Sequence, residues 1–215
     1  QDAILAIEDA RFYQHGGVDY LGVIRAGLAN FGEAKSQGAS TITMQVARNF
    51  YLSTEKTFTR KIYEILLALK IERALPKEKI LEIYMNQIFL GHRAYGFAAA
   101  SEVYFGKPLK DISVAEAAML AGLPKAPSAY NPINNPRRAT LRQQYIIDRM
   151  LEMGFITPEQ HAAAKAEKLR VRPPQEAASH AEFVAELARQ LIFSQYGDEA
   201  YTRGLNVYLT LHADE

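Results

Sequence analysis

Residues 7–17 read Ile-Glu-Asp-Ala-Arg-Phe-Tyr-Gln-His-Gly-Gly and continue an apolar run that opens the chain. The spacing of Ile4, Ile7 and Phe12 predicts a helix that is buried along one side and ends at the two glycines. Glu8 therefore falls on a largely apolar helix. A carboxylate in such a place either forms a structural pair or keeps a raised pKa that suits proton transfer. This stretch alone favours the structural interpretation.

The composition is that of an ordinary globular chain. With 215 residues, 48% of them hydrophobic, the chain is long enough to bury one sizeable core. Its net charge of +1 gives no indication of a nucleic-acid partner, and we expect none. The chain has no cysteine, which excludes disulfides and cysteine-based metal sites. It shows no signal peptide and no apolar run of membrane-spanning length, yet it begins inside a helical pattern, so we expect an anchor elsewhere in a longer parent protein.

Three further blocks follow the first one, whose pattern is E-D-x-x-F-x-x-H-x-G. They are Gly-Ala-Ser-Thr-Ile-Thr-Met-Gln at 38–45, Arg-Lys-Ile-Tyr-Glu at 60–64 and Lys-Ile-Leu-Glu-Ile-Tyr-Met-Asn at 79–86. In this order the four blocks resemble the peptidoglycan glycosyltransferase domain of class A penicillin-binding proteins, glycosyltransferase family 51. The resemblance implies a mainly α fold: a lysozyme-like helical domain with a small membrane-proximal apolar subdomain, followed here by a short C-terminal α/β appendage.

Hydrophobic periodicity independently predicts a helical protein. Helices are expected at 20–31, 41–50, 55–75, 76–90, 113–121, 136–153 and from 157 onward. In the helix at 55–75 the pattern places an apolar face toward the core (Ile62, Ile65, Leu66 and Leu69) and puts Lys61 and Glu64 on the opposite side.

Two domains are expected. Residues 1–170 form the glycosyltransferase domain, and residues 171–215 form a linker and the start of a connection to a following transpeptidase domain. The linker is indicated by Pro173 and Pro174. Beyond it, 181–196 is amphipathic and should be helical, and the alternating pattern at 205–211 predicts a strand.

Two glutamates are candidate catalytic residues. Glycosyl transfer needs a base for the incoming hydroxyl and stabilisation of the charge on the leaving group. The resemblance implies that Glu8 is the general base, which deprotonates the 4-hydroxyl of the acceptor, lipid II, for an inverting attack on C1 of the lipid-linked growing chain. It implies that Glu64 assists near the leaving diphosphate. From the residues alone, the alternative for Glu8 is a helix-surface carboxylate, and the alternative for Glu64 is an ion pair with Arg60 or Lys61.

A leaving diphosphate requires concentrated positive charge, which basic side chains supply. Four basic residues lie between positions 48 and 61: Arg48, Lys56, Arg60 and Lys61. They form either a phosphate-binding cluster or an ordinary solvated helix face. The resemblance places Gln45, Arg48, Lys56 and Lys61 at positions that contact diphosphate in the family.

Further candidates for substrate binding come from the same blocks and the loop after them. Ser40 and Thr41 offer hydroxyls beside a helix N-terminus that suits an anion. Asn86 either reaches the neighbourhood of the second glutamate or is a buried amide. Four arginines that resemble those of the family either line the substrate groove or form salt bridges: Arg93, Arg137, Arg138 and Arg142. The family usually has two glutamines where this chain has Met44 followed by Gln45, so no polar role is expected at position 44.

The remaining residues of the first block are expected to be structural. Phe12 belongs to the core, and His15 fixes a turn by hydrogen bonding. Asp9 either orients Glu8 or binds a divalent cation. The family often implies such a cation, Mg or Mn, and no organic cofactor, but no cluster in the sequence has a spacing that names metal ligands, which stay unknown.

The resemblance also implies partners and a location. The partners are lipid II, the growing lipid-linked glycan chain, the membrane surface and the covalently following transpeptidase domain. The apolar subdomain would lie in the region from Tyr20 to Phe58, whose apolar residues equally suit an ordinary core. The location would be the periplasmic, outer face of a bacterial inner membrane.

Two other functions remain open at this point. A lytic transglycosylase or lysozyme-type hydrolase also uses a glutamate on a helix, but it needs no basic diphosphate site, and Arg48 and Lys61 argue against it. A non-catalytic helical binding module would tolerate the loss of Glu8.

Overall fold

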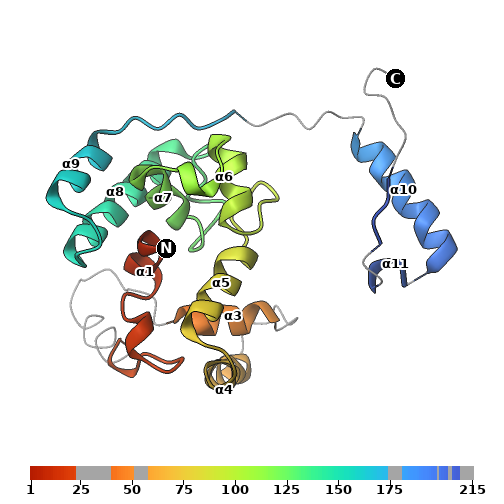
Figure 1. Cartoon of the computed structure of the whole chain (residues 1–215), viewed down its shortest axis with the longest axis horizontal. Helices are drawn as coiled ribbons and strands as arrows, with labels where there is room; N and C mark the ends of the chain where they lie inside the picture. The colour runs from red at the N-terminus through yellow and green to blue at the C-terminus, as the bar shows by residue number, and fades with distance from the viewer. Residues whose placement is uncertain (23–39, 51–57, 174–180, 198, 203–204, 209–215) are drawn as a thin grey trace. The chain divides into compact units, whose positions relative to one another are not determined.

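The computed structural model describes residues 1–22, 40–50, 58–173, 181–197, 199–202 and 205–208 (Figure 1). The chain divides into two compact units, Gln1–Arg172 and Pro173–Glu215. In the first unit the described elements are helical: α1 (Asp2–Glu8), η1 (Phe12–Gln14), α3 (Ile42–Phe50), α4 (Phe58–Ala74), α5 (Lys77–Gln87), α6 (Phe97–Phe105), η2 (Leu109–Asp111), α7 (Val114–Ala121), α8 (Pro136–Glu152) and α9 (Pro158–Ala166). The mainly α fold class is therefore confirmed.

The larger core of the first unit is built around α7. This helix begins with a capping box, in which the Ser113 hydroxyl accepts from the Glu116 backbone N–H and the Glu116 carboxylate accepts from the Ser113 N–H. Its Ala115, Ala118 and Leu120 are fully buried. Helices α1, α6, α8 and α9 pack against it, so that α7 is surrounded by other helices (Figure 1). The C-terminal end of α1 is thereby held on a rigid base.

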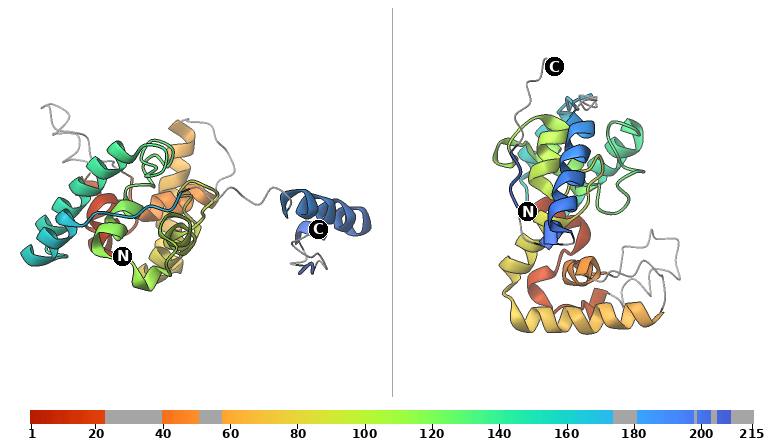
Figure 2. Two further views of the ribbon diagram at one scale, coloured as in Figure 1. Left: turned by 90° about the horizontal axis from the view of Figure 1, so that it is seen from above. Right: turned by 90° about the vertical axis from the view of Figure 1, so that its right-hand side faces the viewer.

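A second layer is formed by α3, α4 and α5. Helix α3 packs on both α4 and α5, and the right-hand view of Figure 2 shows α4 lengthwise at the edge of the unit, where it crosses α3. A small separate core fills this contact, made of Val18, Met44, Ala47 and Ala68. Met44, at the position where the family has a glutamine, is 2% exposed and serves this core. The absence of a polar role at position 44 thus has a packing reason.

Helix α1 ends earlier than the sequence predicted. It stops at Glu8, Asp9 takes an extended φ of −159°, and the separate 3₁₀ turn η1 follows. Gly17 has another role than ending the helix. It has a φ of +89°, and a Cβ there would lie 3.2 Å from the Ala68 backbone. Glycine at this position lets the loop approach α4 closely.

The predicted core face of α4 is wrong in part. Ile62 and Leu66 are each 56% exposed, whereas Glu64 is 1% and Ala68 is 0% exposed. Ile65 and Leu69 do pack, partly buried, against the second core. Apolar residues surround α4 on several sides, so their spacing does not select one face, and the contact with α3 decides which side is buried.

Some predictions fall outside the described residues. Of the helix predicted at 20–31, only 20–22 is described, and it is helical. Lys56 and most of the predicted apolar subdomain lie outside the described ranges. Helix α6, which the sequence analysis did not predict, closes with Gly106 in the left-handed conformation.

The second unit contains α10 (Ala181–Tyr196) and α11 (Glu199–Thr202). The first of these confirms the helix predicted at 181–196. The strand predicted at 205–211 does not form over 205–208, which carry no regular structure, and 209–211 lie outside the described residues. An alternating segment needs a neighbouring strand to pair with, and the described residues contain none. Among the described helices, none combines the length and apolar character needed to cross a membrane.

Candidate active site

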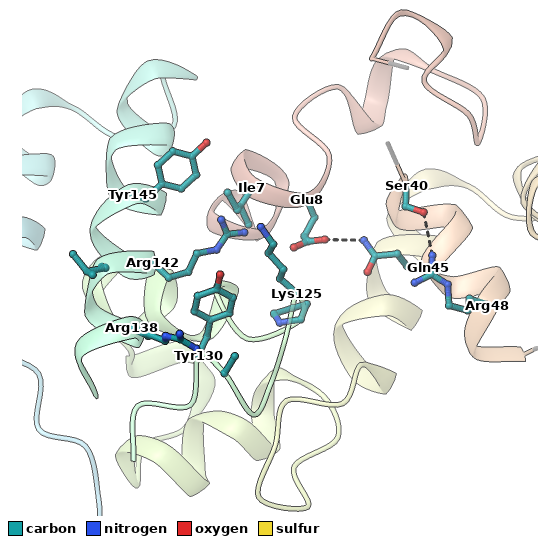
Figure 3. A pocket seen from close by; sticks show the side chains of 13 residues that line it. Ile7, Glu8, Ser40, Gln45, Arg48, Lys125, Tyr130, Arg138, Arg142 and Tyr145 are labelled. Carbon is teal, nitrogen blue, oxygen red and sulfur yellow. Dashed lines mark hydrogen bonds between the residues drawn. The ribbon is translucent and has the colours of Figure 1, made fainter. Parts of the chain in front are cut away.

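The first unit contains a cavity of about 930 Å³ between α1, α3, α8 and the loop after α7 (Figure 3). It is lined by Ile7, Glu8, Ser40, Gln45, Arg48, Pro124, Lys125, Ala129, Tyr130, Arg138, Leu141, Arg142 and Tyr145. The lining holds one acid and four cations. Such a cavity suits an anionic ligand, and Glu8 is its single carboxylate.

Glu8 lies at the last position of α1 and faces Gln45 on α3. The Gln45 side-chain Nε2 donates a hydrogen bond of 2.8 Å to Glu8 Oε2 (Figure 3). Burial raises the pKa of Glu8 above its usual 4.5, against the lowering effects of the Gln45 hydrogen bond and of the charges on Arg142 and Lys125. A carboxylate with a raised pKa is a stronger base, which is the property expected of a group that takes a proton from a hydroxyl.

Asp9, the next residue, is turned into the fold. Its carboxylate lies 2.9 Å from His15 Nε2 and accepts a 3.1 Å hydrogen bond from the Ile42 backbone N–H. It thereby ties the end of α1 to the start of α3. These contacts support the structural role expected for His15, and Asp9 orients Glu8 by fixing the backbone beside it.

Thr41 supports the same junction. Its buried hydroxyl donates to the Gly17 carbonyl at 2.6 Å and accepts from the Met44 N–H at 3.1 Å. Thr41 does not line the cavity, whereas its neighbour Ser40 does. The hydroxyl of Ser40 accepts hydrogen bonds from Arg48 at 3.1 Å and from Lys61 at 2.9 Å.

Glu64, on α4, does not line the cavity itself, but it contacts Arg48, which does. Its carboxylate is paired with Arg48 at 3.0 Å, Arg60 at 3.2 Å and Lys61 at 3.3 Å. We call these three cations the α3–α4 cluster. Burial alone would raise the pKa of Glu64, but the hydrogen bonds and charges of Arg48 and Lys61 outweigh it, and the pKa is lowered. Glu64 thus stays ionised and holds its cations in place.

The two glutamates therefore do not face each other across the cavity. Glu8 lines it, and Glu64 does not. They are connected through α3, because Gln45 and Arg48 lie three residues apart, on neighbouring positions of the same helix. One partners Glu8 and the other partners Glu64.

The opposite side of the cavity carries a second set of cations, which we call the α8 cluster: Lys125, Arg138 and Arg142. The Arg142 guanidinium lies 5.7 Å from the Tyr130 ring and 5.6 Å from the Tyr145 ring, and its Nε is buried without a hydrogen-bond partner. Within the described part of the chain, no ion pair is formed by these three side chains. Arg138 and Arg142 thus line the cavity, which is one of the two roles expected for them from the sequence. Lys125 and Tyr130 were not predicted, because they lie in a proline-rich loop that meets α8 only in the folded chain.

Two predicted substrate-binding residues lie apart from the cavity. Asn86 is exposed near the end of α5, so it is not the buried amide that was the alternative. Arg93 is exposed in the following loop, where it and His92 take positive φ values of 59° and 43°. Neither residue lines the cavity.

The donor set near Glu8 does not fit a divalent cation held by protein side chains. The described residues contain no group of three or more histidines, aspartates and glutamates close enough to hold a metal. Asp9 is already engaged by His15 and Ile42, and the other charged residues that line the cavity are cations. We therefore derive no step through a metal ion.

Comparisons with known proteins identify the family of the chain. Residues 1–151 match the family model described as Transglycosylase. The chain belongs to this family. The transglycosylase chain is 58% identical over 216 residues to penicillin-binding protein 1A of Neisseria lactamica, covering 100% of this chain and 27% of that protein. It is 63% identical over 170 residues to a Cupriavidus necator protein named as a transglycosylase, covering 79% of this chain and 74% of that protein.

A solved structure is also similar. The crystal structure of penicillin-binding protein 1A from Haemophilus influenzae matches with a TM-score of 0.49 and 32% identity, over 77% of this chain and 21% of that one. The transglycosylase chain thus spans about a quarter of the length of the penicillin-binding proteins it matches. The family match and the Neisseria relative confirm the resemblance seen in the four motifs: the chain is a transglycosylase domain that is similar to part of penicillin-binding protein 1A.

Proposed function

We propose that this domain polymerises lipid II into glycan strands by inverting transfer from a donor whose sugar is linked to a lipid diphosphate. The observation that carries the proposal is the position of Glu8, a carboxylate with a raised pKa that lines a cavity together with four cations. A base beside concentrated positive charge is what the transfer of a sugar from a diphosphate requires.

In the proposed reaction Glu8 is the general base. It takes the proton from the 4-hydroxyl of the acceptor sugar as that oxygen attacks C1 of the donor. The bond between C1 and the diphosphate oxygen breaks, its electrons leave with the diphosphate, and the configuration at C1 is inverted. The raised pKa makes Glu8 more basic, and the hydrogen bond from Gln45 stabilises the ionised form that acts as the base.

The leaving diphosphate would lie beside the α3–α4 cluster. Arg48 lines the cavity, and Lys61 shares the Ser40 hydroxyl with it. Glu64 assists as a positioning residue, because its ion pairs hold these cations before the substrate arrives. Preorganised charge of this kind stabilises a leaving group without a cost of rearrangement during the reaction.

The acceptor would enter along the other side of the cavity. There the α8 cluster offers positive charge next to the Tyr130 and Tyr145 rings, which suit the apolar faces of sugars. Because lipid II itself carries a diphosphate, both substrates bring anionic groups, and the cavity has cations on both sides of Glu8.

The proposed setting is the periplasmic face of a bacterial inner membrane. On α4, Ile62 and Leu66 are each 56% exposed and lie one helical turn apart. They form an apolar strip that would rest on the lipid surface where the polyprenyl chain enters. We further propose that the parent protein carries an N-terminal anchor and a following transpeptidase domain, as a class A penicillin-binding protein.

The test is the substitution Glu8→Gln, assayed with labelled lipid II in detergent, with product length read on a gel. We expect polymerisation to fall by about 10²–10⁴-fold, the usual contribution of a general base, with no loss of folding. Glu78→Gln, an exposed acid on α5, is the matched control and should leave the rate unchanged. Undiminished polymerisation by Glu8→Gln would refute the proposal, and shortening of preformed glycan by the unmodified chain would favour the lytic alternative.

A further inference from the structure

A buried tyrosine lies behind Glu8. Tyr84 on α5 is 0% exposed, and its hydroxyl donates a 3.4 Å hydrogen bond to Gln45 Oε1. The other end of the same amide, Gln45 Nε2, donates to Glu8 Oε2 at 2.8 Å. Three side chains from α5, α3 and α1 thus form one continuous chain of hydrogen bonds that ends at the carboxylate in the cavity.

The direction of this chain is fixed by the chemistry of its two ends. An amide has one donor end and one acceptor end, so its orientation follows from the partner at either side. The hydroxyl of Tyr84 remains protonated, because burial and the nearby charge of Glu8 raise its pKa well above 10.0, with Arg48 acting weakly in the opposite direction. A protonated phenol attracts Oε1 of Gln45, and the NH₂ group is then directed at Glu8.

The length of the tyrosine contact does not remove its effect. At 3.4 Å the bond is long for a hydroxyl donor. Its importance comes from the Tyr84 side of the contact, which is fully buried, whereas Gln45 itself is half-buried and lines the cavity. An amide oxygen that faces this buried side gains little from water when its donor is removed. Without the Tyr84 hydroxyl, each of the two orientations of the Gln45 amide leaves one end without a partner, so the tyrosine side no longer selects between them.

We propose that Tyr84 is a positioning residue for the transfer reaction, which acts through the orientation of the Gln45 amide to keep Glu8 ionised. This inference rests on the proposed role of Glu8 as the base. With Tyr84 in place, Glu8 receives a donor that favours its carboxylate form. Without it, the amide can present Oε1 to Glu8, and that arrangement favours the protonated carboxyl.

Other charges face Glu8 and must stay constant in any test. Asp9 lies beside it on the chain, Lys125 faces it from the loop after α7, and Arg142 faces it from α8. Arg48 acts on the Tyr84 side. The substitution Tyr84→Phe removes one oxygen atom and changes none of these groups.

The experiment compares Tyr84→Phe with Tyr104→Phe. Tyr104 is the matched control, because it is also 0% exposed and its hydroxyl donates to the Leu90 carbonyl at 2.7 Å, in a contact that involves neither Gln45 nor Glu8. The rate of polymerisation is measured against pH for both variants. We expect the acid limb of the Tyr84→Phe profile to move to higher pH by about 0.5 unit, which lowers the rate about threefold on that limb and leaves the plateau unchanged.

A second measurement separates this inference from the proposed function. The Glu8 carboxyl is titrated directly by ¹³C NMR in the unmodified chain, in Tyr84→Phe, and in Gln45→Ala with and without Tyr84→Phe. We expect Tyr84→Phe to raise the Glu8 pKa only when Gln45 is present. An unchanged titration, an equal shift in Tyr104→Phe, or an equal shift without Gln45 would each overturn the inference. A titration that shifts as expected while the rate profile does not follow it would instead refute Glu8 as the base.

Discussion

The two cation clusters beside the cavity differ in what lies behind them. The α3–α4 cluster is paired with the buried carboxylate of Glu64 through three ion pairs. The α8 cluster has no ion pair within the described part of the chain, and its Arg142 leaves a buried Nε without a partner. The first cluster therefore has one positive charge balanced and its side chains held in place in the absence of substrate. The second has no carboxylate paired with it and keeps its whole charge for an anionic ligand.

The same contrast appears in the two glutamates. Attraction from Arg48 and Lys61 exceeds the effect of burial at Glu64, so its pKa is lowered. At Glu8 burial exceeds the attraction from Gln45, Arg142 and Lys125, so its pKa is raised. Ionised Glu64 therefore stabilises the fold, and ionised Glu8 lowers its stability in favour of basicity.

The largest expected effect on stability comes from removing the charge of Glu64, the acid paired with the α3–α4 cluster. Glu64→Gln leaves Arg48, Arg60 and Lys61 without their common partner. Breaking a buried ion pair usually costs about 3–5 kcal/mol, and because the three cations are partly exposed we expect the free energy of unfolding to fall by about 2–3 kcal/mol at neutral pH. Denaturant unfolding measures this. Glu82→Gln, in an exposed pair with Lys79, is the control and should change it by less than about 0.5 kcal/mol.

The difference in the free energy of unfolding between the unmodified chain and Glu64→Gln should depend on pH. Because the pKa of folded Glu64 lies below its ordinary 4.5, its stabilising contribution is complete above pH 4.5 and is lost as the pH falls through the lowered value. The gap between the unmodified chain and Glu64→Gln should therefore close in acid. A gap that stays constant down to the pH of acid unfolding would show that Glu64 stabilises the fold by packing rather than by charge.

The sequence identified the α3–α4 cluster more fully than the α8 cluster, of which it indicated only Arg138 and Arg142, and the reason lies in chain distance. Ser40, Gln45 and Lys61 belong to the motif blocks, and Arg48 follows one of them on the same predicted helix. The structure brings Ser40, Gln45 and Arg48 to the cavity. The burial of Glu64 was not predictable from spacing, because α4 has apolar residues on several sides and its contact with α3 selects the buried one. Lys125 and Tyr130 reach the site only through the packing of a proline-rich loop against α8, for which local periodicity gives no signal.

The next prediction compares one lysine from each cluster. Lys125 forms no described ion pair, whereas Lys61 is paired with Glu64 at 3.3 Å. An unpaired cation contributes its whole charge to an incoming anion, and a paired one contributes less. For binding of inorganic pyrophosphate, measured by calorimetry at low salt, we expect about tenfold weaker affinity in Lys125→Ala, about 1.4 kcal/mol, and about threefold weaker affinity in Lys61→Ala. A larger loss in Lys61→Ala would reverse the proposed difference between the clusters.

The smallest effect has the opposite sign and concerns Glu8. Because the folded-state pKa of this carboxyl is raised, ionising it opposes folding, and that cost is present once the pH rises above the raised value. Glu8→Gln is neutral at every pH and keeps a side-chain oxygen that accepts from Gln45. We expect it to increase the free energy of unfolding by about 1 kcal/mol at neutral pH, the size usual when a residue held for activity is replaced. In acid the unmodified Glu8 takes up its proton and the gain should vanish. A loss of stability in Glu8→Gln at neutral pH would mean that the surroundings of Glu8 favour its charge, and the distinction between the two glutamates would no longer hold.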